Sequence, residues 1–181
     1  MNEKDGGDEA GGGRGNLPPY GWTRAAAAGL SFRPMTDADL PFLAQVYAST
    51  RMEELSVVAW PLEQKLAFLK HQFDAQHAHY RKHYHGTDWL VILHAGAPVG
   101  RLYLSRWEVE HRIVDIALLP EHRGRGFGTA LLQDLLDEAA RDAKMLSIHV
   151  EKTNPAMTLY RRLGFVKEGD EGVYDLMRWT P

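Results

Sequence analysis

The spacing of apolar residues along the chain predicts helices and strands in alternation. The first helical pattern begins at a capping box, Thr36-x-x-Asp39, and its apolar positions are Leu40, Leu43, Ala44 and Tyr47. A longer pattern follows Pro61, with apolar positions at Leu62, Leu66, Leu69, Phe73, Tyr80 and Tyr84. Nearly all steps are three or four residues, or multiples of them, as one buried face of a helix requires. We therefore expect two amphipathic helices in the first half of the chain.

Runs rich in apolar and β-branched residues predict the strands of a sheet. They cover residues 31–34, 88–94, 99–107, 112–119, 145–150 and 173–179. Ala95-Gly96-Ala97-Pro98 lies between two of these runs and predicts a hairpin. A third helix, before residue 145, buries Leu131, Leu132, Leu135, Leu136 and Ala139. This order predicts an α/β (α+β) fold, a mixed and mostly antiparallel central sheet of about six to seven strands with helices on both faces.

Residues 1–30 differ in composition from the rest. They contain almost no large apolar side chain, and glycines crowd at Gly6, Gly7, Gly11, Gly12, Gly13 and Gly15. Such a segment cannot offset the entropy that ordering costs. Its acidic start and its short apolar patch, residues 25–30, do not fit a secretory signal. We expect a disordered Gly-rich tail over residues 1–30 and a single domain over residues 31–181.

Composition excludes several functional classes. The chain has no Cys, which rules out disulfides, thiolate metal ligands and a cysteine nucleophile. A formal net charge of −3 argues against a general nucleic-acid binder. No apolar run approaches the length of a membrane span. We expect a cytoplasmic protein with neither nucleic acid nor membrane as a partner.

Five histidines gather on the second predicted helix and at its end, which raises the question of a metal site. They are His71, His77, His79, His83 and His85. His79 and His83 lie one turn apart, as two metal ligands on one helix face would. No H-E-x-x-H pattern is present, and neighbouring pairs point to different faces. We expect a solvated, His-rich helix face and no metal.

Residues 120–129, PEHRGRGFGT, carry the clearest chemical signal. An apolar strand runs into glycines at 124, 126 and 128, and an amphipathic helix follows at once. A helix N-terminus offers unpaired N–H donors and partial positive charge, so it suits a phosphate or pyrophosphate, to which Arg123 and Arg125 would add charge. Neither G-x-x-x-x-G-K-[ST] nor G-x-G-x-x-G is present. The remaining pattern, R-x-x-G-x-G, also fits an ordinary strand-to-helix turn.

A second motif follows the strand at residues 145–150. Asn154 suits a helix N-cap, Pro155 the first helical position, and Gly164 the residue beyond the helix. The motif therefore predicts a short helix of about ten residues between two strands.

Together the two motifs resemble the GNAT superfamily of N-acetyltransferases. The family pattern R/Q-x-x-G-x-G/A is matched at residues 123–128, and N…A-x-x-L-Y-x-x-L-G-F at residues 154–165. The similarity covers roughly residues 31–180 and is strongest over residues 113–165. One difference is that Pro155 alone separates Asn154 from Ala156, whereas many members have one residue more.

The resemblance implies an acyltransferase that uses acetyl-CoA as co-substrate and moves its acetyl group to a primary amine. The amine would attack the thioester directly in a ternary complex, which fits a chain without Cys. A backbone N–H near Leu118 would stabilise the oxyanion. The residues that the resemblance assigns to the cofactor are Ile116, Ala117, Leu118, Leu119, Arg123, Gly124, Arg125, Gly126, Phe127, Gly128, Thr129, Asn154 and Tyr160.

Two catalytic residues are expected. By resemblance, Tyr160 lies near the sulfur and would protonate the leaving thiolate; the alternative is a packed ring with a capped hydroxyl. Asp115 is a lone acid in an apolar strand and is the candidate base, unless it faces the other way and pairs with an arginine. Other candidates for the base are Glu108, Glu110, His111, His149 and water.

The acceptor amine has no motif of its own and is either a small molecule or a peptide. Residues expected near it are Glu53, Glu54, Trp60, Tyr80 and Tyr84. A non-catalytic acyl-CoA-binding module is the alternative from another class, and an ATP-binding domain is disfavoured because the P-loop lysine is missing. Tyr174 and Trp179, in the last strand, are candidates for a homodimer edge.

Overall fold

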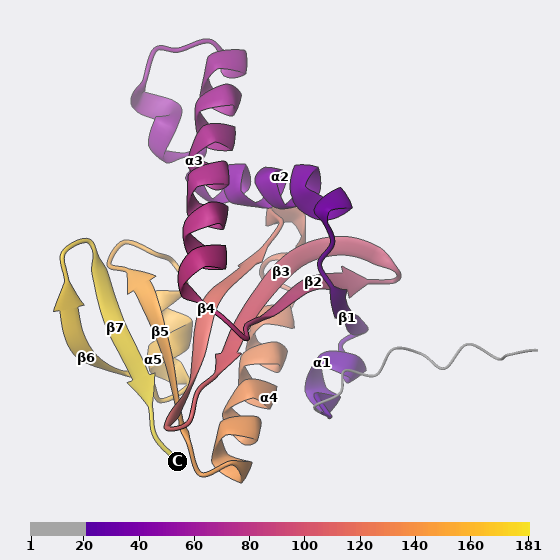
Figure 1. Cartoon of the computed structure of the whole chain (residues 1–181), viewed down its shortest axis with the longest axis vertical. Helices are drawn as coiled ribbons and strands as arrows, with labels where there is room; N and C mark the ends of the chain where they lie inside the picture. Colours follow the sequence, from indigo (N-terminus) through magenta and orange to yellow (C-terminus); the bar gives the residue numbers. More distant parts are fainter. Residues whose placement is uncertain (1–20) are drawn as a thin grey trace, which may run out of the picture.

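The computed structural model describes residues 21–181, and the expected tail over residues 1–20 lies outside them (Figure 1). The helices are α1 (Thr23–Ala27), α2 (Leu40–Arg51), α3 (Leu62–His83), α4 (Phe127–Arg141) and α5 (Met157–Arg162). The strands are β1 (Leu30–Pro34), β2 (Asp88–His94), β3 (Ala97–Arg106), β4 (Glu110–Leu118), β5 (Met145–Glu151), β6 (Val166–Glu171) and β7 (Tyr174–Trp179). Short 3₁₀ turns lie at Asp37–Asp39, Glu54–Val57 and Pro120–His122.

The strands form one sheet of seven in the order β1-β2-β3-β4-β5-β7-β6. Every neighbouring pair is antiparallel except β4 and β5, which run parallel. The predicted mixed, mostly antiparallel sheet is thus confirmed. The strand β6 was not predicted, because nearly all of its side chains are exposed and no buried face marks it.

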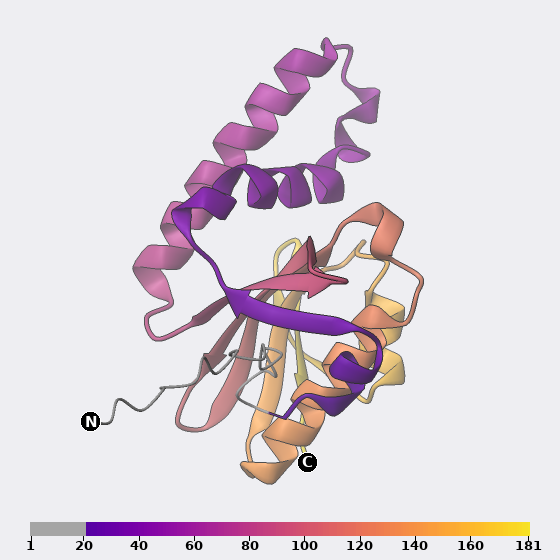
Figure 2. The same ribbon diagram turned by 90° about the vertical axis from the view of Figure 1, so that its right-hand side faces the viewer.

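Helices cover both faces of the sheet (Figure 2). On one face, the apolar side of α4 packs with α1, α5 and the strands around the largest core cluster, in which Leu131, Leu135 and Leu146 are almost fully buried. On the other face, α2 and α3 share a second cluster built on Leu43, Tyr47, Leu69 and Phe73. The 3.6-residue periodicity of these helices therefore places one apolar stripe on each face of the sheet.

The folded part of the chain begins earlier than the sequence indicated. Residues 22–30 are not a tail: Trp22 and Ala25 are buried, and α1 packs on α4. Two acids of α4 hold it, since Glu138 accepts the indole N–H of Trp22 at 2.7 Å and Asp134 accepts the amide of Ala25 at 2.7 Å. The expected boundary at residue 30 was wrong. The glycines lie mainly before residue 16, and residues 22–30, which follow them, pack against the domain.

The two central strands separate halfway along their length. β4 pairs with β5 only from Glu110 to Ile113, opposite Met145 to Ile148. Beyond that point β4 keeps β3 as its partner, and the register shifts by one residue at Val114, which forms a bulge. A bulge bends its strand and increases its twist. The result is a gap in the sheet between residues 114–118 of β4 and the end of β5.

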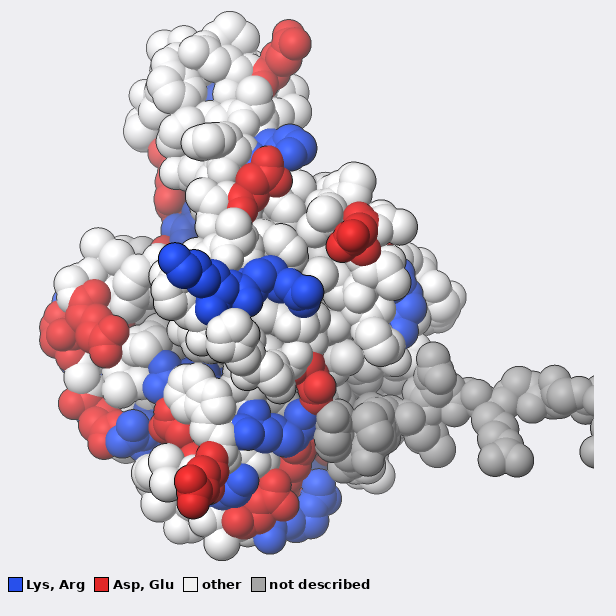
Figure 3. All heavy atoms as spheres, viewed as in Figure 1, with Lys and Arg blue, Asp and Glu red and all other residues white. Residues whose placement is uncertain are grey.

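The N-terminal end of α3 projects beyond the body of the molecule (Figures 1 and 2). The face seen in Figure 3 is mostly uncharged at this end, whereas acidic and basic side chains are interspersed over the body below. Exposed apolar residues at this end include Val57, Trp60, Leu62 and Leu66. None of the described helices is long and apolar enough to cross a membrane.

Candidate active site

The glycine-rich segment forms the turn from β4 into α4. Gly124 and Gly126 have φ of +69° and +84°, a backbone region that glycine enters without the steric cost that other residues have there. A Cβ at either position would meet no atom within 4 Å, so their side is open. Gly126 caps α4, and no side chain caps that end. The first amides of α4 are therefore available to an anion, as the sequence predicted.

A cavity of about 690 Å³ lies along this turn and continues into the gap beside β4. Most of the residues assigned to the cofactor line it, namely Ile116, Ala117, Leu118, Arg123, Gly124, Gly126, Phe127, Gly128, Thr129, Asn154 and Tyr160. Two assigned residues do not. Leu119 is buried and donates its N–H to Val99 of β3, and Arg125 lies over the ring of Phe127, 5.0 Å from its centroid.

Arg123 fastens the glycine turn to its surroundings. Its Nε donates to the carbonyl of Leu118 at 2.8 Å, and its Nη2 donates to the hydroxyl of Ser49 in α2 at 3.2 Å. A guanidinium in this position joins the end of β4, the turn and α2. The geometry thus gives Arg123 a bracing role besides the charge that it was expected to add for a phosphate.

The edge of β4 that faces the gap offers main-chain groups. The N–H of Leu119 donates to Val99 of β3 at 2.9 Å, so it points to the paired side. Successive amides in a strand point to opposite sides. The N–H groups of Leu118 and Ile116 therefore point into the gap, where an extended ligand with amides can pair with them as an added strand would.

The second motif starts with a turn and not with a helix. The side chain of Asn154 accepts the amide of Ala156 at 2.8 Å, and α5 begins only at Met157. The helix has six residues, fewer than the ten expected, because the turn at residues 154–157 takes up its first part. With Oδ1 engaged, the amide nitrogen of Asn154 remains for the cavity that this residue lines.

Tyr160 of α5 lies where two cavities meet. It is 4 % exposed, packs against Phe165 at 5.6 Å between ring centroids, and lines both the cofactor cavity and a second, smaller one. Among the described residues, none forms a hydrogen bond with its hydroxyl. Burial raises the pKa of Tyr160, and the nearby charge of Asp115 raises it further. The phenol is therefore held in the protonated form that an acid needs.

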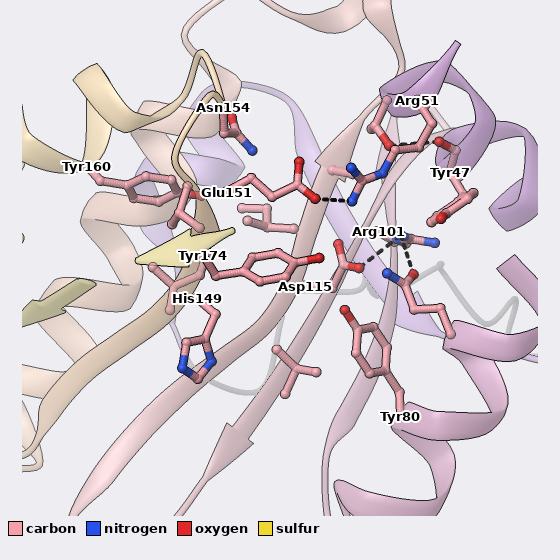
Figure 4. Close-up of a pocket in the computed structure, with 17 residues that line it drawn as sticks. Tyr47, Arg51, Tyr80, Arg101, Asp115, His149, Glu151, Asn154, Tyr160 and Tyr174 are labelled. Carbon is pink, nitrogen blue, oxygen red and sulfur yellow. Dashed lines mark hydrogen bonds and ion pairs between the residues drawn. The ribbon is translucent and has the colours of Figure 1, made fainter. Parts of the chain in front are cut away.

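The smaller cavity, of about 150 Å³, lies between the α2–α3 layer and the ends of β4, β5 and β7 (Figure 4). Its polar and aromatic walls are Tyr47, Thr50, Arg51, Gln76, Tyr80, Arg101, Asp115, His149, Glu151, Asn154, Tyr160 and Tyr174. It shares Thr50, Ile116, Ala117, Asn154 and Tyr160 with the cofactor cavity. We call it the acceptor pocket, because a second substrate there would meet whatever lies in the gap.

Asp115 lies in the acceptor pocket and is paired with an arginine. Its Oδ2 accepts Nη2 of Arg101 at 2.9 Å, and its side chain is 14 % exposed. Arg101 is fully buried and also donates to Gln76 and to the carbonyl of Leu43. The predicted alternative, an arginine partner for Asp115, is thus confirmed, and Asp115 also lines the pocket.

The other candidate bases are not equivalent. Glu108 is exposed at the far end of the sheet, Glu110 pairs with Arg112 and Arg178, and His111 faces α4. His149 lines the pocket, but its Nδ1 lies 2.9 Å from Nη1 of Arg112, which can only donate. Its Nε2 lies 3.1 Å from Glu171. This nitrogen is buried and forms no hydrogen bond, so neither ring nitrogen of His149 is open to an amine in the pocket.

Comparison with known families now gives the decisive observation. Residues 50–165, well over half of the chain, match the model of the acetyltransferase (GNAT) family. The chain belongs to this family. It is the family that the two motifs predicted.

Individual relatives agree with the family. A streptothricin acetyltransferase of Streptomyces lavendulae is 40% identical over 73 residues, which are 39% of each chain. A Bacillus subtilis (strain 168) protein, named provisionally as a ribosomal protein bS18-alanine N-acetyltransferase, is 32% identical over 51% of this chain and 67% of its own. The PaiA N-acetyltransferase of Thermoplasma acidophilum, solved in complex with coenzyme A, has a TM-score of 0.64 at 14% identity and covers 84% of this chain and 99% of that one. At this low identity, the similarity to the Thermoplasma protein shows that the two chains share a fold.

Several residues of this acetyltransferase site were not expected. Arg51, Glu151, Tyr47 and Tyr174 line the acceptor pocket, and His122 and Arg162 line the cofactor cavity. A signal for Glu151 existed: Ser147, His149 and Glu151 alternate with apolar residues along β5 and share one face. The others come from separate elements, and no local pattern links them.

The residues expected near the acceptor are only partly there. Tyr80 lines the acceptor pocket, whereas Glu53 lines the cofactor cavity. Glu54 pairs with Arg51 at the surface, Trp60 packs on Phe68, and Tyr84 stacks on Trp107. Tyr174 and Trp179 are no sheet edge, because β7 lies between β5 and β6.

In the described part of the chain, the histidines of α3 form no group of three or more side chains that could hold a metal ion. His79 and His83 stack at 4.2 Å between ring centroids, and His83 contacts the carbonyl of His79. A different group, His111, Glu138 and Asp142, has ligand atoms within 4.8 Å of one another. Glu138 already accepts the indole of Trp22 and pairs with Arg106, so this group belongs to the attachment of α1 and β3 to α4.

Proposed function

We propose that the protein acetylates a primary amine, of a small molecule or a peptide, by direct attack of the amine on acetyl-CoA in a ternary complex. The observation that carries this proposal is the meeting of two cavities at Tyr160. One cavity runs along the glycine turn and the open edge of β4, and the other enters from the α2–α3 face. Two substrates can therefore approach one point from opposite sides.

The cofactor cavity fits coenzyme A in its chemistry. The open amides at Gly126–Thr129 suit a pyrophosphate, because a helix N-terminus favours negative charge. The N–H groups of Ile116 and Leu118 suit the amides of the pantetheine arm. Arg123 keeps the turn and the strand end in register for both contacts. The nitrogen of Asn154 is placed to donate to the arm from the other wall of the gap.

The bond changes follow from this arrangement. The amine nitrogen attacks the thioester carbonyl, a C–N bond forms, and the C–S bond breaks to release the thiolate of coenzyme A. An N–H of β4, at Leu118 or Ile116, points into the gap and would donate to the oxyanion of the tetrahedral intermediate. Tyr160 gives its proton to the thiolate, which it can do because its phenol stays protonated.

The incoming amine must lose a proton before or during attack. Asp115 is the group that we assign to this step, acting directly or through water, because it lies in the acceptor pocket and electrostatically influences Tyr160. Arg101 holds one oxygen of Asp115, and the other oxygen has no partner among the described residues. That free oxygen can accept an N–H of the ammonium group.

Initial-rate kinetics test the proposal. With acetyl-CoA and an amine varied together, a ternary complex gives intersecting reciprocal plots, and a covalent acetyl-enzyme gives parallel ones. We expect intersecting plots and a mass increase of one acetyl group on the amine. Binding of acetyl-CoA without turnover over a broad panel of amines and peptides would instead support a non-catalytic acyl-CoA-binding module.

A further inference from the structure

The acceptor pocket contains two ion pairs that come from opposite walls. Arg101 and Asp115 lie on β3 and β4, and Arg51 of α2 pairs with Glu151 of β5 (Figure 4). The two carboxylates therefore stand on the two strands that separate at the gap. The pocket has a volume of about 150 Å³ and four charged side chains line it. A charged group that loses water must be compensated by a polar partner, so this pocket suits a polar ligand.

Both arginines of the pocket are already occupied. One nitrogen of Arg51 pairs with Glu54 at 3.0 Å and another pairs with Glu151. Arg101 uses both terminal nitrogens on Asp115, Gln76 and the carbonyl of Leu43, and its Nε is buried without a partner and away from the cavity surface. An anionic group on the acceptor would have to break one of these pairs to find a cation.

The two carboxylates, in contrast, keep accepting capacity. Arg101 contacts Oδ2 of Asp115, and Arg51 contacts Oε1 of Glu151. Within the described part of the chain, Oδ1 of Asp115 has no hydrogen-bond partner, whereas Glu151 also interacts with the phenol of Tyr174. A carboxylate has about four acceptor sites, so both acids keep some of them. Both side chains point into the pocket (Figure 4). Each can therefore receive N–H donors from a ligand while it remains held by its arginine.

Aromatic rings add to the preference of the pocket for a cationic ligand. Tyr47, Tyr80 and Tyr174 line the pocket around the two acids, and the face of an aromatic ring attracts ammonium groups. The two acids also differ in their surroundings. Asp115 lies on β4 next to Ile116, whose N–H points into the gap, whereas Glu151 lies on β5 and pairs with Arg51 of α2. Asp115 thus lies on the strand along which the thioester would run, and Glu151 lies on the strand across the gap.

We propose that the acceptor carries a second cationic group besides the amine that is acetylated, and that Glu151 is the specificity-determining residue that binds this second group. This inference rests on the proposed acetyltransfer. A compact diamine meets both requirements: one amine lies at Asp115 and Tyr160, and the other lies at Glu151 and Tyr174. A carboxylate in the place of the second amine would face Glu151 and be repelled.

Three acceptors that differ at one end test the inference: diaminobutane, butylamine and γ-aminobutyrate. For the unaltered protein we expect kcat/KM to be highest for diaminobutane and lowest for γ-aminobutyrate. The gain over butylamine should be about ten- to a hundredfold, which corresponds to one hydrogen bond to a charged group. Equal use of diaminobutane and butylamine, or a preference for γ-aminobutyrate or for an alanine-ended peptide, would overturn the inference.

The variant Glu151→Gln locates the selectivity. It should lose most of the preference for diaminobutane over butylamine. Glu54→Gln is the matched control, because Glu54 also pairs with Arg51 but lies outside the pocket. Acetyl-CoA affinity and the unfolding temperature show that both variants are folded. A preference that survives in Glu151→Gln would overturn the assignment of this residue.

The same assays separate this inference from the proposed function. Acetylation of butylamine without selectivity contradicts only the second cationic group. Failure to acetylate any of the three amines or the peptide contradicts the proposed acetyltransfer, and the inference falls with it. The acceptor series in the unaltered protein requires no variant, so it decides the substrate class even if Glu151→Gln does not fold.

Discussion

The two cavities that meet at Tyr160 are built in different ways. About half of the residues that wall the cofactor cavity belong to one continuous segment from the end of β4 through the glycine turn into α4, and the others come from the turn before α5, α5 itself, β1, β2 and the α2 region. The acceptor pocket is walled by side chains from seven helices and strands, and two ion pairs hold it in place. We therefore expect cofactor recognition in this protein to depend on the path of the backbone at the glycine turn, and acceptor recognition to depend on individual charged and aromatic groups.

This difference predicts how each side responds to substitution. A change on the cofactor side acts through backbone conformation and alters the binding of acetyl-CoA. A change on the acceptor side acts on one hydrogen bond or charge and alters the rate or the choice of amine. Tyr160 belongs to both cavities, so its removal should have the largest effect.

Tyr160→Phe removes only the hydroxyl and leaves the packed ring in place. We expect kcat to fall about a hundredfold or more, the usual contribution of a positioned general acid, with little change in acetyl-CoA affinity. Since burial raises the pKa of Tyr160, the phenol should stay protonated up to pH about 10, so no loss of its proton should limit kcat below that pH. Tyr103→Phe, a buried tyrosine outside both cavities, is the control. An unchanged kcat would remove Tyr160 from the mechanism.

Gly126→Ala tests the backbone side of the comparison. Gly126 has φ of +84°, and an alanine there adds strain of about 1–3 kcal/mol or shifts the turn. The affinity for acetyl-CoA, measured by calorimetry, should fall about ten- to a hundredfold, whereas kcat at saturating acetyl-CoA should change little. Gly96→Ala has the same kind of φ, +79°, in the distant β2–β3 hairpin. It should lose stability without losing affinity; an equal loss of affinity would refute a local role for the glycine turn.

Asp115→Asn tests the acceptor side. Asparagine keeps an oxygen for Arg101 but removes the charge, so we expect kcat/KM for amines to fall about tenfold and the acidic limb of the pH–rate profile to move. Acetyl-CoA affinity should remain, which a calorimetric titration checks. Because Arg101 is buried, the unfolding temperature must be measured too, and rates are compared well below it. An acidic limb that does not move would exclude Asp115 as the base.

The buried histidine of β4 that faces α4 gives the smallest expected effect. Burial lowers the pKa of His111, beside α4, below its ordinary value of 6.5. The unfolded chain therefore takes up this proton first as the pH falls, and the folded state loses stability below about pH 6.5. His111→Gln should reduce the fall in unfolding free energy between pH 6.5 and pH 5 by about 1 kcal/mol or less. His79→Gln, on the exposed face of α3, is the control variant.

The same contrast explains what could be predicted from the sequence. The glycine turn and the Asn154–Phe165 motif are local features. Their φ angles, helix caps and apolar spacing are determined by residues close together in the sequence. The sheet followed from six apolar runs, and α2, α3 and α4 followed from their periodicity. These features depend on interactions between residues near one another in the sequence, so the pattern of residues along the chain predicts them.

The features that were missed depend on distant partners. Arg51 and Glu151 are a hundred positions apart and form a pair only because α2 lies beside the end of β5. Residues 22–30 looked like a tail because nothing local reveals that Glu138 accepts the indole of Trp22. The strand β6 has almost no buried side chain and is held chiefly by its pairing with β7. A pattern along the chain does not contain such contacts.

The central claim is that the open amides of the glycine turn hold the pyrophosphate of acetyl-CoA and direct its thioester into the gap beside β4. A nuclear magnetic resonance titration of the ¹⁵N-labelled protein with acetyl-CoA tests it most directly. We predict the largest amide shift changes at Gly126, Phe127, Gly128 and Thr129, together with Ile116 and Leu118. Saturable changes confined to another part of the molecule, or no change at millimolar acetyl-CoA, would contradict the account.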